Sequence, residues 1–292
     1  MTAAHEAQPR LTLVVVAYDM PEQIVRTVRS LSPPMQRDVD AAEYEVVVVD
    51  NGSRRPIDRT ACEAFGARVR WLAAERPTPS PAAAVNLGIR SASATLVGAM
   101  VDGARLASPG LVSAALEAAT RAPRPIVATL GLHLGHEPQQ LAVAGGYDER
   151  AERELLESVD WTADGYRLFE ISSFGKSARD GWYELPVESN AVFMPATMWA
   201  ELGGFDEAFT SPGGGLVNLD LFRRACQLPR SELFILVGEA TFHQFHGGVS
   251  TNTTESRWEE FHAEYVRVRG EPYEKPAVRP TFVGTPPTTR TR

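Results

Sequence analysis

Cysteine is scarce in this sequence, which has two among 292 residues, Cys62 and Cys226. They are far apart and show no paired spacing, which excludes a disulfide framework and predicts reduced thiols. Basic residues are outnumbered, because 29 Lys and Arg stand against 37 Asp and Glu and leave a net charge of −8. This balance argues against a nucleic-acid partner. A nucleotide is not excluded, because backbone amides or a divalent cation can hold its phosphates.

Long hydrophobic runs are missing as well. The longest one near the start, LTLVVVAY at 11–18, is too short to cross a membrane and lacks a small-residue cleavage site. We therefore expect no integral membrane segment and a cytoplasmic protein. The segment that follows, AYDMPEQ, has neither glycine nor a basic residue. Nucleotidyl transfer, which needs a glycine-rich basic loop there, is disfavoured for that reason.

What the first half does contain is a repeated alternation of apolar β-branched runs and helical patterns. The runs lie at 11–17, 45–49, 69–72, 96–101 and 126–130. Short continuous runs of this kind are typical of strands buried on both faces, as in parallel sheets. Ser108 and Pro109 predict a helix start between two of them. The pattern predicts an α/β fold with a doubly wound, mostly parallel sheet.

The second half has a weaker rhythm. Strands are expected at 191–194 and 233–237, and helices near 196–202 and from Asn218. Ser256 and Glu259 fit a capping box at the start of a further helix, which Gly270 ends. Residues 271–292 are rich in Pro and Thr, so we expect a poorly ordered tail. Residues 1–270 are predicted to form a single domain.

Three of the expected strands end in carboxylates. Asp19, Asp50 and Asp102 follow the first, second and fourth strands in AYD, VDNGS and VDG. Because the carboxyl ends of parallel strands share one edge, where ligands bind in open α/β sheets, Asp50 and Asp102 are expected at a common site. Asp19 is interpreted as a helix N-cap. Arg105, three residues after Asp102, is interpreted as a solvated charge on an exposed turn, with a phosphate contact as the alternative.

These blocks carry a resemblance. LTLVVVAYDMPEQIVRTVRSL, YEVVVVDNGS and NLGIRSASATLVGAMVDGARLASPG resemble, in order and spacing, the nucleotide-binding half of a family-2 glycosyltransferase with the GT-A fold. GGFDEAF and NLDLFRRA are similar to its acceptor-side half. The resemblance implies a Rossmann-like nucleotide-sugar-binding half over 10–130 and a mixed acceptor-side half over 131–270. The segment 131–185 is unmatched, and we expect it to shape the acceptor pocket.

The resemblance also implies a reaction and its residues. A sugar would move from a nucleotide-diphosphate donor, usually a UDP-sugar, to a hydroxyl of a saccharide or small-molecule acceptor. By position, Ala17, Tyr18 and Asp50 would contact the nucleoside, and Asn86 would lie near the donor. Asp102 holds the first position of an Asp-x-Asp-like motif at the diphosphate.

Two family carboxylates are replaced. Ala104 stands at the second acidic position of the Asp-x-Asp-like motif, and Asn218 stands at the position of the usual catalytic base. Asparagine cannot accept a proton at neutral pH, so residue 218 cannot act as general base. Asp220 and Glu188 are the candidate bases. The alternative for Asp220 is a carboxylate favoured by the helix dipole.

A metal site is the remaining expectation. A departing diphosphate needs a cation or convergent hydrogen-bond donors, and His246 in FHQFHGG resembles a late metal-ligating histidine of GT-A enzymes. Asp102 and His246 are therefore predicted to bind Mn²⁺ or Mg²⁺. His243, and the pair in HLGH at 133–136, are interpreted as loop histidines without a metal.

The sequence thus predicts a metal-assisted glycosyltransferase, with inversion favoured. A retaining GT-A transferase and a non-catalytic nucleotide-sugar-binding protein remain alternatives, the latter because of Ala104 and Asn218. A homo-oligomer stays open.

Overall fold

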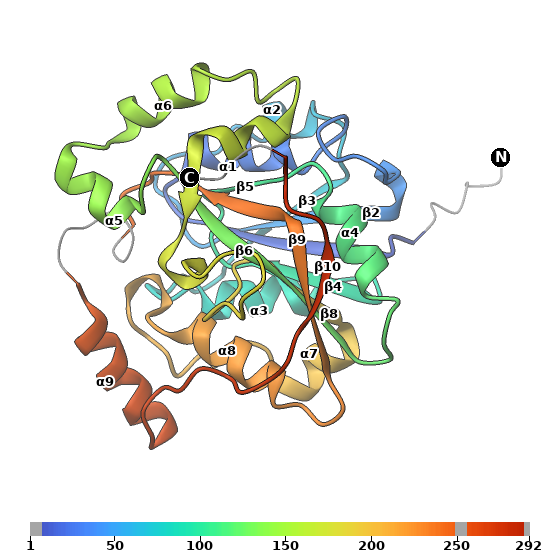
Figure 1. The fold of residues 1–292 in the computed structure, drawn as a ribbon, viewed down its shortest axis with the longest axis vertical. Helices are drawn as coiled ribbons and strands as arrows, with labels where there is room; N and C mark the ends of the chain where they lie inside the picture. The colour runs from blue at the N-terminus through green and yellow to red at the C-terminus, as the bar shows by residue number, and fades with distance from the viewer. Residues whose placement is uncertain (1–7, 249–255, 289–292) are drawn as a thin grey trace.

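The computed structural model describes residues 8–248 and 256–288, and one mixed sheet runs through its centre (Figure 1). In spatial order the main path of the sheet is β10-β9-β6-β8-β4-β1-β2-β3, with β5 paired to β9 and β7 to β6. The strands are β1 (Leu11–Ala17), β2 (Tyr44–Asp50), β3 (Val69–Ala73), β4 (Leu96–Met100), β5 (Arg105–Ala107), β6 (Pro125–Leu134), β7 (Ser172–Phe174), β8 (Val192–Pro195), β9 (Glu232–His243) and β10 (Thr281–Gly284).

Helices cover both faces of this sheet. In Figure 1, α1 and α2 lie on one side, and α3, α7 and α8 lie on the other. The helices are α1 (Pro21–Ser30), α2 (Arg59–Glu63), α3 (Ala82–Arg90), α4 (Leu111–Ala118), α5 (Gln139–Ala142), α6 (Glu149–Glu157), α7 (Ala196–Leu202), α8 (Val217–Cys226) and α9 (Trp258–Arg269). Among the described helices, none combines the length and the apolarity that a bilayer crossing requires.

The strand pairing confirms the predicted α/β architecture. β4, β1, β2 and β3 are parallel neighbours, and β8 joins β4 in the antiparallel sense, so the sheet is mostly parallel in its first half and mixed in its second. The alternating valines of β1 and β2 are buried on both faces, which explains why these strands read as continuous apolar runs.

Three local predictions are wrong. Ser256 and Glu259 do not form a capping box, because the N-cap of α9 is Arg257, whose side chain makes no capping hydrogen bond within the described part of the chain. Ser108 does not cap α4, whose N-cap is Gly110; its hydroxyl donates to Glu239 instead. The segment after residue 270 is not a poorly ordered tail throughout, because Thr281–Gly284 forms β10 and pairs in parallel with β9. Threonine, phenylalanine and valine favour a strand, and the sheet edge at β9 offers unpaired backbone groups to it. Residues 289–292 of that predicted tail lie outside the described part of the chain.

The order of strands places the candidate site. The chain leaves β1 for β2 and β3 on one side and returns to β4 on the other, so the strand order reverses at β1. Ala17, the last residue of β1, is in register with Asp50, the last residue of β2. Val15 is in register with Met100 of β4, two residues before Asp102. Asp50 and Asp102 therefore flank the end of β1 at a topological switch point, as predicted.

Candidate functional site

Asp102 sits on a tight turn at the end of β4. Its Oδ1 atom accepts a 3.0 Å hydrogen bond from the backbone N–H of Ala104. Gly103 makes this turn possible, because a Cβ atom there would lie 2.5 Å from the carbonyl oxygen of Val16 in β1. The glycine therefore lets the chain cross closely over the neighbouring strand and turn the carboxylate of Asp102 toward the sheet edge.

Ala104 stands where the family motif has a second carboxylate, and the structure gives a physical reason for its absence. Its side chain is fully buried in the apolar cluster beneath α1, beside residues such as Met20 and Ile24. A carboxylate at this position would be buried among apolar groups, which is costly without a partner. The turn is also tied to α1, because Thr27 donates a hydrogen bond to the carbonyl of Gly103.

Two histidines meet the Asp102 carboxylate. Nε2 of His243 lies 3.0 Å from Oδ2 of Asp102, and Nε2 of His246 lies 3.6 Å from the same oxygen. The three residues offer one ligand atom each, and these atoms all lie within 4.8 Å of one another. The prediction that Asp102 and His246 lie close together is confirmed. The interpretation of His243 as a loop histidine is wrong, because it ends β9 and faces the carboxylate.

The tautomer of His243 follows from Gln139. The side-chain NH₂ of Gln139 faces the backbone carbonyls of His243 and Leu134, so its Oε1 atom is the one that lies 2.7 Å from Nδ1 of His243. Nδ1 must therefore carry the proton and donate it to Gln139, which leaves a lone pair on Nε2 pointing at Asp102. A lone pair and a carboxylate oxygen 3.0 Å apart are suited to sharing a cation.

The electrostatics of the three residues agree with this geometry. Burial lowers the pKa of His243 to about 4, so the ring is neutral at pH 7. Burial by itself would raise the pKa of Asp102, but His246 and His243 hold it well below its usual value. Burial opposes the charged form of His246, and the Asp102 carboxylate outweighs it and raises the pKa of that ring. Metals bind ionised carboxylates and neutral imidazoles, so Asp102 and His243 are already in their binding states, whereas a protonated His246 would release its proton when a metal binds.

The segment that carries His246 is held from several sides. Glu152 of α6 accepts a 2.5 Å hydrogen bond from the N–H of Phe245, whose carbonyl accepts one from Gln23 of α1. Nε of Arg26, also on α1, donates to the side chain of Gln244 at 2.9 Å. The α5–α6 region, for which the sequence showed no match, therefore helps to position the histidine segment.

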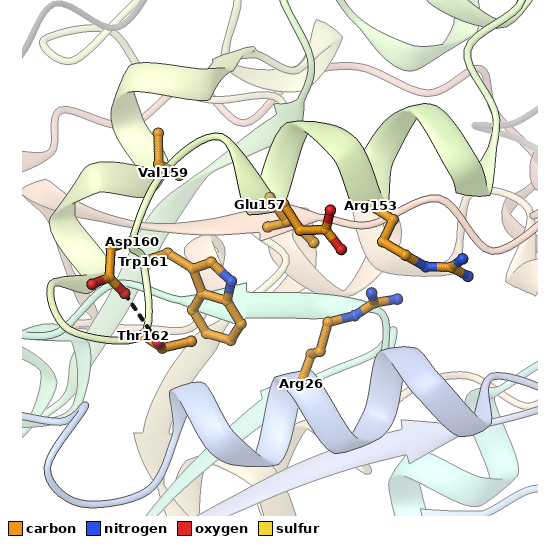
Figure 2. Close-up of a pocket in the computed structure, with 8 residues that line it drawn as sticks. Arg26, Arg153, Glu157, Val159, Asp160, Trp161 and Thr162 are labelled. Atoms are coloured by element: carbon orange, nitrogen blue, oxygen red, sulfur yellow. Dashed lines mark hydrogen bonds between the residues drawn. The ribbon is translucent and has the colours of Figure 1, made fainter.

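A cavity of about 430 Å³ lies between α1 and α6 beside this network. Figure 2 shows Arg26 extending from α1 toward α6, which carries Glu157 and Arg153, with the indole of Trp161 alongside. The cavity is lined by Arg26, Arg153, Leu156, Glu157, Val159, Asp160, Trp161 and Thr162. Most of these residues come from the segment expected to shape the acceptor pocket.

Glu188 and Asn218 form a second polar pair. The side-chain amide of Asn218, at the start of α8, donates a 2.6 Å hydrogen bond to Oε2 of Glu188 and a 3.0 Å bond to the carbonyl of Ser189. Burial raises the pKa of Glu188, although the Asn218 hydrogen bond and the positive charge of Arg105 oppose this. A partly buried carboxylate with a raised pKa is a suitable proton acceptor.

Asp220, the other candidate base, is placed differently. Its side chain is about 1% exposed and pairs with two arginines, Arg224 at 2.7 Å and Arg269 of α9 at 2.5 Å. A carboxylate enclosed by two guanidinium groups has no face left for an acceptor hydroxyl. This geometry favours a structural role for Asp220 as the partner of two arginines.

On the nucleoside side, Asp50 stays at the sheet edge, where its Oδ1 atom accepts a hydrogen bond from the N–H of Ser53. Tyr18 is about half exposed next to the buried Ala17, so its ring is accessible at the same edge. Asp19 is not an N-cap, because α1 is preceded by Met20. The Asp19 carboxylate instead accepts hydrogen bonds from the backbone and the side chain of Arg54.

The polar atoms of Asn86 are engaged within the protein. Its side-chain amide donates to the carbonyl of Phe205 at 2.8 Å and to Glu207 at 2.9 Å, and its oxygen accepts from the N–H of Phe205. These bonds hold the GGFDE turn against α3 and support a structural role for Asn86. Its contact with a donor stays a prediction.

Comparisons with known proteins agree with this fold. Residues 12–143 match the family model described as Glycosyl transferase family 2. Validoxylamine A glucosyltransferase of Streptomyces hygroscopicus subsp. jinggangensis (strain 5008) is 30% identical over 240 residues, which cover 78% of this chain and 54% of that protein. The protein of the same name from subsp. limoneus is also 30% identical over 240 residues, with 51% of its length covered. The chain spans about half the length of these curated relatives.

Solved structures share the fold. The crystal structure of S. aureus TarS 1–349 in complex with UDP-GlcNAc superposes with a TM-score of 0.54 at 12% identity, over 91% of this chain and 68% of that chain. The crystal structure of S. aureus TarS gives a TM-score of 0.53 at 14% identity, over 82% and 37% of the two chains. At this level of identity the likeness concerns the fold alone, and it bears out the predicted GT-A architecture.

Proposed function

Because residues 12–143 belong to glycosyl transferase family 2, we propose that this protein transfers a sugar from a nucleotide-diphosphate donor, a UDP-sugar in the first instance, to an acceptor hydroxyl. The observation that carries the proposal is the convergence of Asp102, His243 and His246 at the edge where Asp50 and Tyr18 also lie. A nucleoside would occupy the Asp50 side, and its diphosphate would lie at Asp102.

A divalent cation would be held by Asp102, His243 and His246. When bound, it would neutralise the charge that develops on the departing diphosphate. Two imidazole ligands favour Mn²⁺ over Mg²⁺, which prefers oxygen ligands. Gln139 would support the site by keeping the proton of His243 on Nδ1, so that Nε2 stays available.

The proton of the acceptor hydroxyl would pass to Glu188. In this step the acceptor oxygen forms a bond to the anomeric carbon, and the bond between that carbon and the diphosphate oxygen breaks. Asn218 occupies the family base position and orients Glu188 through its 2.6 Å hydrogen bond. A base on the acceptor side is consistent with inversion, which we keep as the favoured stereochemistry.

The proposal is tested by thermal stabilisation with UDP-, GDP- and dTDP-linked sugars, with and without Mn²⁺. A bound ligand raises the melting temperature by mass action. The screen therefore reports both the preferred nucleobase of the donor and the requirement for metal. Turnover of the stabilising donor, followed by the anomeric configuration of the product, then separates the outcomes. Stabilisation without transfer or donor hydrolysis would identify a non-catalytic binding protein, and a retained configuration would replace inversion.

A further inference from the structure

Arg105 lies inside the protein rather than on an exposed turn. It is the first residue of β5, and it is about 5% exposed. The interpretation of this residue as a solvated surface charge is therefore wrong. β5 pairs with the end of β9, where Arg105 is in register with His243, and His243 is in register with His133 of β6. Because side chains in register share a face of the sheet, the guanidinium belongs to the same row as the metal-facing histidine.

The guanidinium of Arg105 has charge neighbours, but two of its three nitrogens have no hydrogen-bond partner in the described part of the chain. Within the described residues, the Nε and Nη1 atoms of Arg105 are buried and make no hydrogen bond. Nε lies 3.9 Å from Oδ2 of Asp102, which is too long for a hydrogen bond. Glu188 contributes a second negative charge nearby. Burying a charged group with unsatisfied N–H donors is costly, and native proteins rarely keep one without a function.

Gly131 of β6 packs against Arg105. A Cβ atom on Gly131 would lie 3.5 Å from Nη1 of Arg105, an ordinary contact, and 3.0 Å from Nδ2 of Asn190, where it would press on the amide. The guanidinium is influenced by the charges of both Asp102, where the diphosphate is proposed to bind, and Glu188, the proposed base. The scissile bond of a donor would lie between those two groups.

From this arrangement we propose that Arg105 binds the leaving diphosphate of the donor and stabilises the negative charge on its β-phosphate as the bond to the sugar breaks. This inference rests on the proposed function. The fork of two N–H groups on a guanidinium matches two phosphate oxygens. Arg105 would supply positive charge from the protein itself at a site where Ala104 leaves a cation with one carboxylate ligand fewer than the family motif provides.

Binding of UDP and UMP to the wild type and to Arg105→Gln, measured by calorimetry in the presence of EDTA, tests this directly. We expect the variant to lose about tenfold or more in affinity for UDP, while its affinity for UMP, which lacks the β-phosphate, changes less than about threefold. Equal losses for both nucleotides, or no loss for UDP, would overturn the assignment.

Thermal unfolding of the ligand-free variants separates function from structure. Arg70 is the matched control, because it makes hydrogen bonds to Glu45 and Ser91. Arg70→Gln should lower the melting temperature and leave UDP affinity unchanged. Arg105→Gln should leave the melting temperature unchanged or raise it, because it removes unsatisfied donors. A fall like that of Arg70→Gln would make Arg105 a structural ion-pair residue. If the wild type itself binds no nucleoside diphosphate, the result contradicts the proposed function and not the role of Arg105 alone.

Discussion

The side-chain amide of Asn218 donates a 2.6 Å hydrogen bond to the carboxylate of Glu188, so the asparagine at the family base position is joined to a partly buried acid. The two residues come from different elements, α8 and the loop before β8, and are 30 residues apart. Their contact suggests that the role of the base has moved from position 218 to position 188, rather than being lost.

Replacement of that acid is the first prediction. Glu188→Gln should lower kcat by about 10²- to 10⁴-fold, the usual contribution of a general base, with donor affinity unchanged. The double variant Glu188→Gln/Asn218→Asp returns a carboxylate to the family position and should recover part of the activity. Steady-state kinetics with the donor identified in the screen measures both. An undiminished kcat in Glu188→Gln would remove this residue from the mechanism.

The pH dependence of kcat for the same reaction should have a defined direction. Because burial raises the pKa of Glu188, the carboxylate that accepts the proton is lost at a higher pH than for an exposed glutamate. The acidic limb of the kcat profile should therefore lie above about 4.3, the ordinary pKa of glutamate, and activity should fall as pH drops through it. The limb should be absent from the residual activity of Glu188→Gln.

Metal binding can be tested without turnover. Mn²⁺ alone should raise the melting temperature of the wild type, and His243→Ala and His246→Ala should each lose most of that increase. His136→Ala is the matched control, because His136 belongs to a second His-x-x-His pair but is exposed. If His243→Ala keeps the full Mn²⁺ effect while His246→Ala loses it, His243 is not a ligand.

Asp220 should prove structural. Asp220→Ala leaves Arg224 and Arg269 without their buried partner, and breaking a buried ion pair in this way costs about 3–5 kcal/mol of unfolding free energy. Asp206 also pairs with Arg269 but is more exposed, so Asp206→Ala is the comparison variant and should cost less unfolding free energy. Urea denaturation measures both variants. A stable Asp220→Ala protein with kcat reduced like that of Glu188→Gln would restore Asp220 as the base.

Glu239 predicts a pH dependence of stability. Burial raises its pKa even though Ser108, Gly110 and Tyr166 donate hydrogen bonds to it. As pH rises, the Glu239 carboxyl loses its proton in the unfolded chain before it does so in the folded protein. The unfolding free energy therefore falls between the pKa of Glu239 in the unfolded chain and its higher pKa in the folded protein. The unfolding free energy of the wild type minus that of Glu239→Gln should therefore decrease from pH 4 toward pH 7. A constant difference would contradict a raised pKa.

Several parts of the site could be predicted from the sequence. Apolar β-branched runs separated by helical patterns predict parallel strands, and parallel strands bring their carboxyl ends to one edge. That rule alone placed Asp50 and Asp102 on either side of β1. The FHQFHGG motif identified His246 through the family resemblance. For these residues, local pattern and strand direction were sufficient.

Other assignments depended on contacts that no local pattern records. β9 continues to His243, beyond the predicted end at 237, because it pairs with both β5 and β6; only that pairing turns the ring toward Asp102. Asp220 is neutralised by Arg269, 49 residues away, and the amide of Asn86 is used by a turn 119 residues away. A charged side chain gains or loses its function according to what surrounds it once the chain is packed.

The sequence by itself determined the sheet, its binding edge and the presence of a carboxylate and a histidine there, because strand period and direction are local properties that carry over into the fold. Only the tertiary structure decided which charges face the site. In that structure Ala104 is buried under α1, Asp220 lies between two arginines, and Arg105 is buried rather than exposed. These placements could not be predicted locally, because burial and partners are set by segments distant along the chain.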